Sequence, residues 1–248
     1  AFLTSTALVA LAEIGDKTQL LSFVLAARLR KPWPIIAGIF VATILNYLGY
    51  SPRLVDAAQA SSLPGDTRGI AGIVSSFWTD DLPSGWQTWL KQQLSRGTPW
   101  VALHSFGFSM TAAWQQRLQL GSTGKLQDAQ QIQVYQRHPL LEFESSLPAL
   151  RNEFRDLTAR KGEVLLDLQN KQGAHYHPVA VTDWGGFALA PFAVATLPDN
   201  SNRWIVDPIG FMAKALHLVP LPVPDVTTEN GRRILVSHID GDGFVSQA

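Results

Sequence analysis

The amino-acid sequence predicts an N-terminal two-helix transmembrane hairpin followed by a soluble α/β domain with a mostly parallel sheet, flavodoxin-like or related. Three observations lead to this fold class. Two long apolar runs fill residues 1–50, which hold only six charged side chains. Beyond residue 50 the composition becomes that of a water-soluble protein, and strand-like and helix-like segments alternate along it. The chain ends on a strand-like run without a stop signal, so the fold is expected to be truncated at its C-terminus.

The expected hairpin consists of a helix over residues 2–27 and a second helix over residues 33–49. At roughly 1.5 Å per residue these helices are about 39 Å and about 25 Å long, close to what a bilayer core requires. The turn at 28–34 is basic and carries an interfacial Trp between two prolines. The positive-inside rule places this turn in the cytoplasm. Residues after 50 are therefore expected on the periplasmic face of a bacterial inner membrane.

Two acids interrupt the first apolar run. Glu13 and Asp16 are three residues apart, so they share one face of a helix. A charge at mid-membrane costs at least about 2.5 to 3.5 kcal/mol, so such groups normally line a polar path. Thr18 and Gln19 add oxygen ligands of the kind that Ca²⁺ and Mn²⁺ prefer. The alternative is a soluble helical hairpin in which these acids lie on a solvated face.

The segment "ALAEIGDKTQLL", followed by "RKPWPIIAGIFVATILN", resembles the first two helices of the Gdt family of manganese/calcium–proton exchangers. The hallmark of that family is E-x-G-D-K-[ST]. The resemblance implies that Glu13 and Asp16 ligate the transported cation, Mn²⁺ or Ca²⁺, with Thr18, Gln19 and Asn46 nearby. The family carries two copies of the motif in inverted repeats, whereas this chain has one. A second copy of the chain or a homologous half is therefore expected to complete the ion site.

The α/β domain is expected over residues 51–230, after a boundary near residues 49–52. The pattern predicts a strand over 70–78, a helix over 86–95, a strand over 98–107 and a helix over 109–119. Further strands are expected in "EVLLDLQ", "HPVAVTDW", "FALAPFAVATL" and "NRWIVD". Asp207 followed by Pro208 predicts the start of a helix that runs to Leu218. An extended linker then leads to the last strand, within residues 231–248.

The C-terminal "SHIDGDG" carries a second resemblance. Together with "NRWIVDPIGFMAKALHL" and "DLPSGWQTWLKQQLSRGTPWVALHSFGF", it makes residues 60–248 similar to PelA-like exopolysaccharide deacetylase proteins, up to the first deacetylase motif. The resemblance implies that Asp240 is the base and Asp242 a ligand of Zn²⁺ or another divalent metal. The H-x₃-H that completes such a metal site is not present in the chain. Residues 231–248 are therefore expected to be the first strand of a truncated domain without enzyme activity.

Several polar pairs outside these motifs have two interpretations. Asp80-Asp81 can cap the helix that follows or act in catalysis, and capping is preferred. His104-Ser105 follows a strand, where α/β sheets often place ligand groups, but the sequence names no partner base. His175 and His177 lie on one face of a strand, as a surface pair or, less simply, a metal site. His238 is interpreted as a hydrogen-bonded strand residue.

Composition limits the partners. The net charge is zero, with 20 basic and 20 acidic residues, so no nucleic-acid partner is expected. The absence of cysteine excludes thiolate zinc sites and disulfides. The main hypothesis is a membrane protein with a partial Gdt-type transport motif and an extracytoplasmic α/β module. The alternative is a membrane-anchored, non-catalytic, carbohydrate-associated part of a PelA-like protein that meets exopolysaccharide. A third possibility is an artificial join of two unrelated genes.

Overall fold

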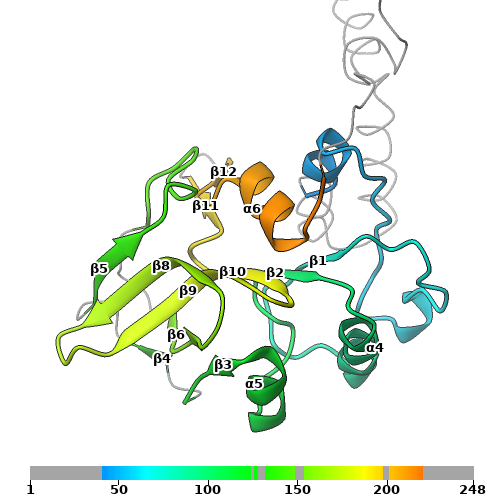
Figure 1. Ribbon diagram of the computed structural model, residues 1–248, viewed down its shortest axis with the longest axis horizontal. Helices are drawn as coiled ribbons and strands as arrows, with labels where there is room; N and C mark the ends of the chain where they lie inside the picture. Colours follow the sequence, from blue (N-terminus) through cyan, green and yellow to red (C-terminus); the bar gives the residue numbers. More distant parts are fainter. Residues whose placement is uncertain (1–40, 124–125, 128–131, 149–153, 198–200, 220–248) are drawn as a thin grey trace, which may run out of the picture.

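The computed structural model describes residues 41–123, 126–127, 132–148, 154–197 and 201–219. Within them the main feature is a six-stranded sheet in the order β1-β2-β10-β9-β8-β5 (Figure 1). Its strands are β1 (Ile73–Ser76), β2 (Trp100–His104), β10 (Gly185–Leu189), β9 (His175–Thr182), β8 (Glu163–Asn170) and β5 (Ile132–Arg137). The helices are α4 (Ser84–Ser95), α5 (Ala112–Leu118), α6 (Pro208–Ala215) and the short 3₁₀ helix η1 (Ala60–Ser62).

The sheet is mixed, which corrects the expectation of a mostly parallel, flavodoxin-like sheet. Strands β1, β2 and β10 run parallel to one another. Strands β10, β9, β8 and β5 are joined by antiparallel pairings. The reason lies in the connections, because a turn of only two residues, 183–184, joins β9 to β10 and so short a link can connect only antiparallel neighbours. Apolar periodicity does not carry that information, since a buried strand has the same pattern in either direction.

Both faces of the sheet are covered. Alternate residues of β2 point to opposite sides, so Val101 and Leu103 contact α6 side chains such as Phe211. Trp100 and Ala102 belong to the cluster on the other face, which also contains the apolar side chains of α4 and α5. Figure 1 shows α6 on one side of the sheet and α4 and α5 on the other. The helices expected over 86–95 and from Pro208 are confirmed.

Three two-stranded ribbons complete the described structure. They pair β3 (Leu120–Gly121) with β7 (Thr158–Ala159), β4 (Leu126–Gln127) with β6 (Phe154–Arg155), and β11 (Val194–Thr196) with β12 (Asn202–Trp204). The run "FALAPFAVATL", expected to be one strand, is divided between β10 and β11 at a cis Ala190–Pro191 bond. Pro191 has no N–H to donate to a strand ladder, so the strand ends before it.

The structure does not support the two-helix transmembrane hairpin. Of the second expected helix, residues 41–49 are described, and residues 41–47 among them are helical. Within the described residues no helix is long and apolar enough to cross a membrane. The buried side chains of Val41 and Leu48 pack in the same cluster as Phe211 and Leu216. An apolar run can thus be covered by protein as well as by lipid, and its composition alone does not separate these outcomes.

Residues 41–50 are also joined to the end of α6 by hydrogen bonds. The Tyr50 hydroxyl donates to the Val219 carbonyl at 3.1 Å and accepts from the Val219 amide at 3.2 Å. The end of the N-terminal segment and the end of the last described helix therefore lie side by side. Residues 1–40, which contain the whole first expected helix, lie outside the described residues.

Candidate functional site

Most of the site residues expected from the two resemblances lie outside the described residues. This holds for Glu13, Asp16, Thr18 and Gln19 of the cation motif, and for Asp240 and Asp242 near the C-terminus. His238, interpreted as a strand residue, also lies outside the described residues. Asn46 is described. It lies on the exposed side of the helix at 41–47, and its backbone carbonyl accepts a hydrogen bond from the Gly49 amide at 2.9 Å.

The structure brings together a different set of side chains, at the carboxyl ends of β1 and β2. Because these strands are parallel, the loops that follow them start at the same edge of the sheet. Asp80 follows β1 and Ser105 follows β2, and the Ser105 hydroxyl lies 2.7 Å from Asp80 Oδ1. Arg155 of β6 forms an ion pair with the other oxygen of the Asp80 carboxylate. We call Asp80, Ser105 and Arg155, with Trp78 and His104, the carboxyl-edge cluster.

The role of Asp80 differs from the expected helix cap. Helix α4 begins after Pro83, which makes no side-chain capping bond. Asp80 is instead almost fully buried and holds the two loops together through Ser105 and Arg155. Arg155 was not predicted as a partner of Asp80, because it comes from a distant part of the chain and from a separate ribbon. A buried carboxylate does require a cationic or hydrogen-bonding partner somewhere in the fold.

His104 occupies a strained backbone position in this cluster. Its φ of 67° is left-handed, and the Ser105 amide donates to the Leu103 carbonyl at 2.8 Å, which closes a γ-turn centred on His104. The buried imidazole stacks on the Trp78 ring, with 3.9 Å between the ring centroids. Burial lowers the pKa of His104 to about 4, so the ring is neutral at pH 7. Its Nδ1 atom has no hydrogen-bond partner among the described residues.

The chemistry of this edge favours binding over hydrolysis. The Ser105 oxygen already accepts a hydrogen bond from the Gly107 amide at 2.9 Å. The Asp80 carboxylate is already engaged by the Ser105 hydroxyl and by the ion pair with Arg155. The charges of Asp80 and Arg155 cancel and His104 is neutral. Beside these groups lies Trp78, which is exposed (61%).

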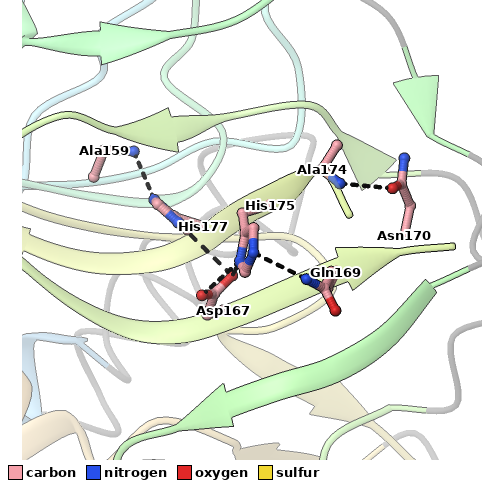
Figure 2. Close-up of polar contacts among 7 residues, drawn as sticks. All are labelled: Ala159, Asp167, Gln169, Asn170, Ala174, His175 and His177. Atoms are coloured by element: carbon pink, nitrogen blue, oxygen red, sulfur yellow. Dashed lines mark hydrogen bonds and ion pairs between the residues drawn. The ribbon is translucent and has the colours of Figure 1, made fainter. Parts of the chain in front are cut away.

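A second polar cluster lies on the neighbouring strands β8 and β9 (Figure 2). His175 Nδ1 lies 2.9 Å from both carboxylate oxygens of Asp167, and His177 Nε2 lies 3.7 Å from Asp167 Oδ1. The two imidazoles share one face of the strand, as predicted. They are not a simple surface pair, because His177 is largely buried and both rings face one carboxylate. In the part of the chain that the structure describes, no group of three or more His, Cys, Asp or Glu residues could hold a metal ion.

Comparison with known proteins concerns the N-terminal segment. Residues 1–49 match the family of the divalent cation/proton antiporter GDT1. This match contains the "EIGDKT" motif and confirms the resemblance to the Gdt family for this part of the chain. A similar protein from Vibrio cholerae serotype O1 (strain ATCC 39541 / Classical Ogawa 395 / O395) is described as "Putative manganese exporter". It is 74% identical over 39 residues.

The shared region with the Vibrio cholerae protein is short. It covers 16% of this chain and 20% of that protein, so the chain spans about a fifth of the length of this curated relative. The GDT1 match likewise ends at residue 49. Neither match reaches the six-stranded sheet, and the resemblance of residues 60–248 to PelA-like proteins stays a prediction.

Proposed function

We propose that residues 1–49 form a Gdt-type divalent-cation-binding segment that acts in cation/proton exchange, with Mn²⁺ as the first cargo and Ca²⁺ as the second. One observation carries the proposal: the match to the GDT1 antiporter family covers all of these residues, including the acidic motif. The identity to a protein described as a manganese exporter favours Mn²⁺. Both matches also favour a membrane location, while the periplasmic placement of residues after 50 stays a prediction.

The residue types suit such an exchange. Glu13 and Asp16 are the proposed cation ligands, because a carboxylate binds either a hard divalent cation or a proton, and the two compete for it. Thr18, Gln19 and Asn46 supply neutral oxygens that complete a coordination shell without adding charge. The exposed position of Asn46 leaves it at a surface where a partner segment can approach. One motif copy provides half of a paired site, so a second copy of this chain or a homologous half is proposed as partner.

Transport in lipid vesicles tests this proposal. The full chain is reconstituted, and the uptake of Mn²⁺ and Ca²⁺ is measured against an imposed proton gradient. Glu13→Gln and Asp16→Asn should each lower uptake by about tenfold or more, since the loss of even outer-shell partners costs that much in metal affinity. Asp66→Asn is the matched control, because Asp66 is an exposed carboxylate that forms an ion pair with its neighbour Arg68. Uptake that is equal in empty vesicles, or unchanged in both acid variants, refutes the proposal.

A second candidate function, carbohydrate binding by the body after residue 50, is supported by Trp78. Its exposed ring is held in place by stacking on His104, and such a ring provides a flat apolar surface of the kind on which sugar rings stack. The neighbouring Arg155, whose side chain is about half exposed, offers donors to hydroxyl groups.

Binding to a panel of neutral and N-acetylated oligosaccharides tests this second function. Trp78→Ala should abolish binding, while Tyr47→Ala, at another exposed aromatic residue, should leave it unchanged. A native chain that retains none of these oligosaccharides contradicts the idea. The two functions are distinguishable, because Trp78→Ala leaves the cation motif intact.

A further inference from the structure

The Asp167–His175–His177 cluster lies where the β3–β7 ribbon meets the central sheet, and Leu120 and Leu157 of this region share a core cluster with Ala180 of β9. The β3–β7 ribbon, formed by residues 120–121 and 158–159, lies beside β9 of the central sheet. Among the described residues, two hydrogen bonds join residues 157–159 to β9, and His177 makes both of them. Its backbone amide donates to the Leu157 carbonyl at 2.6 Å, and its Nδ1 atom accepts from the Ala159 amide at 3.0 Å (Figure 2).

The hydrogen bonds fix where the proton of neutral His177 is located. Because Nδ1 accepts from a backbone N–H, the ring proton must be on Nε2, which faces the Asp167 carboxylate at 3.7 Å. A second proton can therefore bind only at Nδ1. That proton would meet the Ala159 N–H as one donor facing another, so the bond between His177 and Ala159 would be lost.

We propose that His177 is an acid-sensitive clasp, which holds the β3–β7 ribbon against the central sheet when Nδ1 is free and releases Ala159 when Nδ1 binds a proton. The clasp is independent of the cation-exchange function proposed for residues 1–49.

His175 lacks this property although it is on the same face of β9. Its Nδ1 atom donates to Asp167, and its Nε2 atom lies 3.0 Å from the Gln169 side-chain amide. When His175 binds a proton at Nε2, Gln169 can turn its amide oxygen toward the ring, and no backbone hydrogen bond is lost. His175 is therefore the matched control for His177.

The groups around His177 set the direction of the pH effect. Asp167 of β8 and His175 of β9 are the titratable groups that face it among the described residues; β7 contributes the Ala159 amide, and β10 has no titratable side chain. Burial lowers the pKa of His177 from its ordinary value of 6.5, and Asp167 acts in the opposite direction. In the closed form, in which His177 accepts the Ala159 hydrogen bond, the pKa of His177 is lower than in the open form. The closed form therefore has its full stability at a pH above 6.5. This stability is lost as the pH falls below 6.5 toward the lowered value.

Hydrogen–deuterium exchange of the full chain tests the clasp, read at the Ala159 amide between pH 7.5 and pH 5 and corrected for intrinsic exchange. Ala159 should lose protection on acidification, by about tenfold for each unit by which the pKa differs between the open and closed forms. The Trp100 amide, which donates to the Trp184 carbonyl inside the sheet at 2.9 Å, should stay protected and serves as the internal reference.

Two variants keep the test decisive. His177→Asn places an amide oxygen near the former Nδ1 position but does not titrate, so Ala159 should stay protected throughout the pH range. His175→Asn should leave the native pH dependence in place. The proposal is overturned by a native Ala159 amide that is equally protected at pH 7.5 and pH 5. It is also overturned by a His177→Asn variant with the pH dependence of the native chain.

Discussion

The buried imidazole of His104 makes the stability of this fold depend on pH. Its pKa lies at about 4 in the folded chain, because burial disfavours the charged ring, against 6.5 ordinarily. The unfolded chain therefore binds a proton at higher pH than the folded chain does. The stabilising effect of a neutral His104 is complete above pH 6.5 and is lost as the pH falls toward 4. At about 1.36 kcal/mol per pKa unit, this loss is about 3 kcal/mol.

The substitution His104→Asn tests this dependence on pH, because it removes the titrating group and is compatible with the left-handed backbone. Asn adopts positive φ more readily than other side chains, so the γ-turn at φ 67° should persist. At pH 7.5 the variant should be less stable than the native chain by only about 1 kcal/mol in the free energy of unfolding. The loss of stacking on Trp78 lowers its stability, and relief of backbone strain offsets part of that loss. On acidification to pH 4 the native chain loses about 3 kcal/mol and the variant does not. After the deficit of about 1 kcal/mol at pH 7.5 is subtracted, the variant should be the more stable chain at pH 4 by about 2 kcal/mol.

Urea unfolding at pH 7.5, 6, 5 and 4 measures this effect as a difference between variant and native chain. Contributions from carboxylates and from His177 occur in both chains and cancel in that difference. His138→Gln is the control, because His138 pairs with Glu163 on a partly exposed surface and should leave the native slope unchanged. Free-energy curves for the native chain and His104→Asn that run parallel from pH 7.5 to 4 would refute the burial argument.

Three further substitutions examine the packing of the described fold, each by urea unfolding at pH 7.5. Arg155→Gln should destabilise the chain by about 1 to 2 kcal/mol because it leaves the Asp80 carboxylate buried without its cation. The half-exposed position of Arg155 limits this loss. An unchanged free energy of unfolding would show that Asp80 is solvated. Gly185→Ala should prevent folding, since φ is 136° and a Cβ atom would collide with the Trp100 carbonyl oxygen. A folded variant would contradict the turn between β9 and β10. Leu48→Ala should lower the free energy of unfolding by about 2 to 4 kcal/mol, because Leu48 is buried in the core. Tyr47→Ala, at an exposed neighbour, should change it hardly at all. Equal effects of the two substitutions would refute this packing.

Local features of the fold could be predicted because neighbouring residues encode them. The Asp207-Pro208 pair predicted the start of α6, and Asp207 Oδ1 accepts the Ile209 and Gly210 amides as an N-cap does. The apolar spacing that includes Trp86 and Leu90 predicted α4, and both side chains are buried. A strand over 98–107 was predicted, and β2 occupies Trp100–His104 within it. The partners of that edge were not, because Arg155 lies far along the chain.

The similarity of residues 1–49 to the GDT1 family can be read from the residues alone, because a motif such as "EIGDKT" is recognised from residue types at fixed spacing. The sequence also determined the helix starts and the strand-forming runs, which depend on backbone preferences and local hydrogen bonds. Four features became known only from the three-dimensional fold: the strand directions, the burial of Val41 and Leu48 against α6, and the links from Asp80 to Arg155 and from His177 to Ala159. These features join residues that are distant in the sequence. They form because buried charges and backbone amides must find partners wherever the fold brings one within reach.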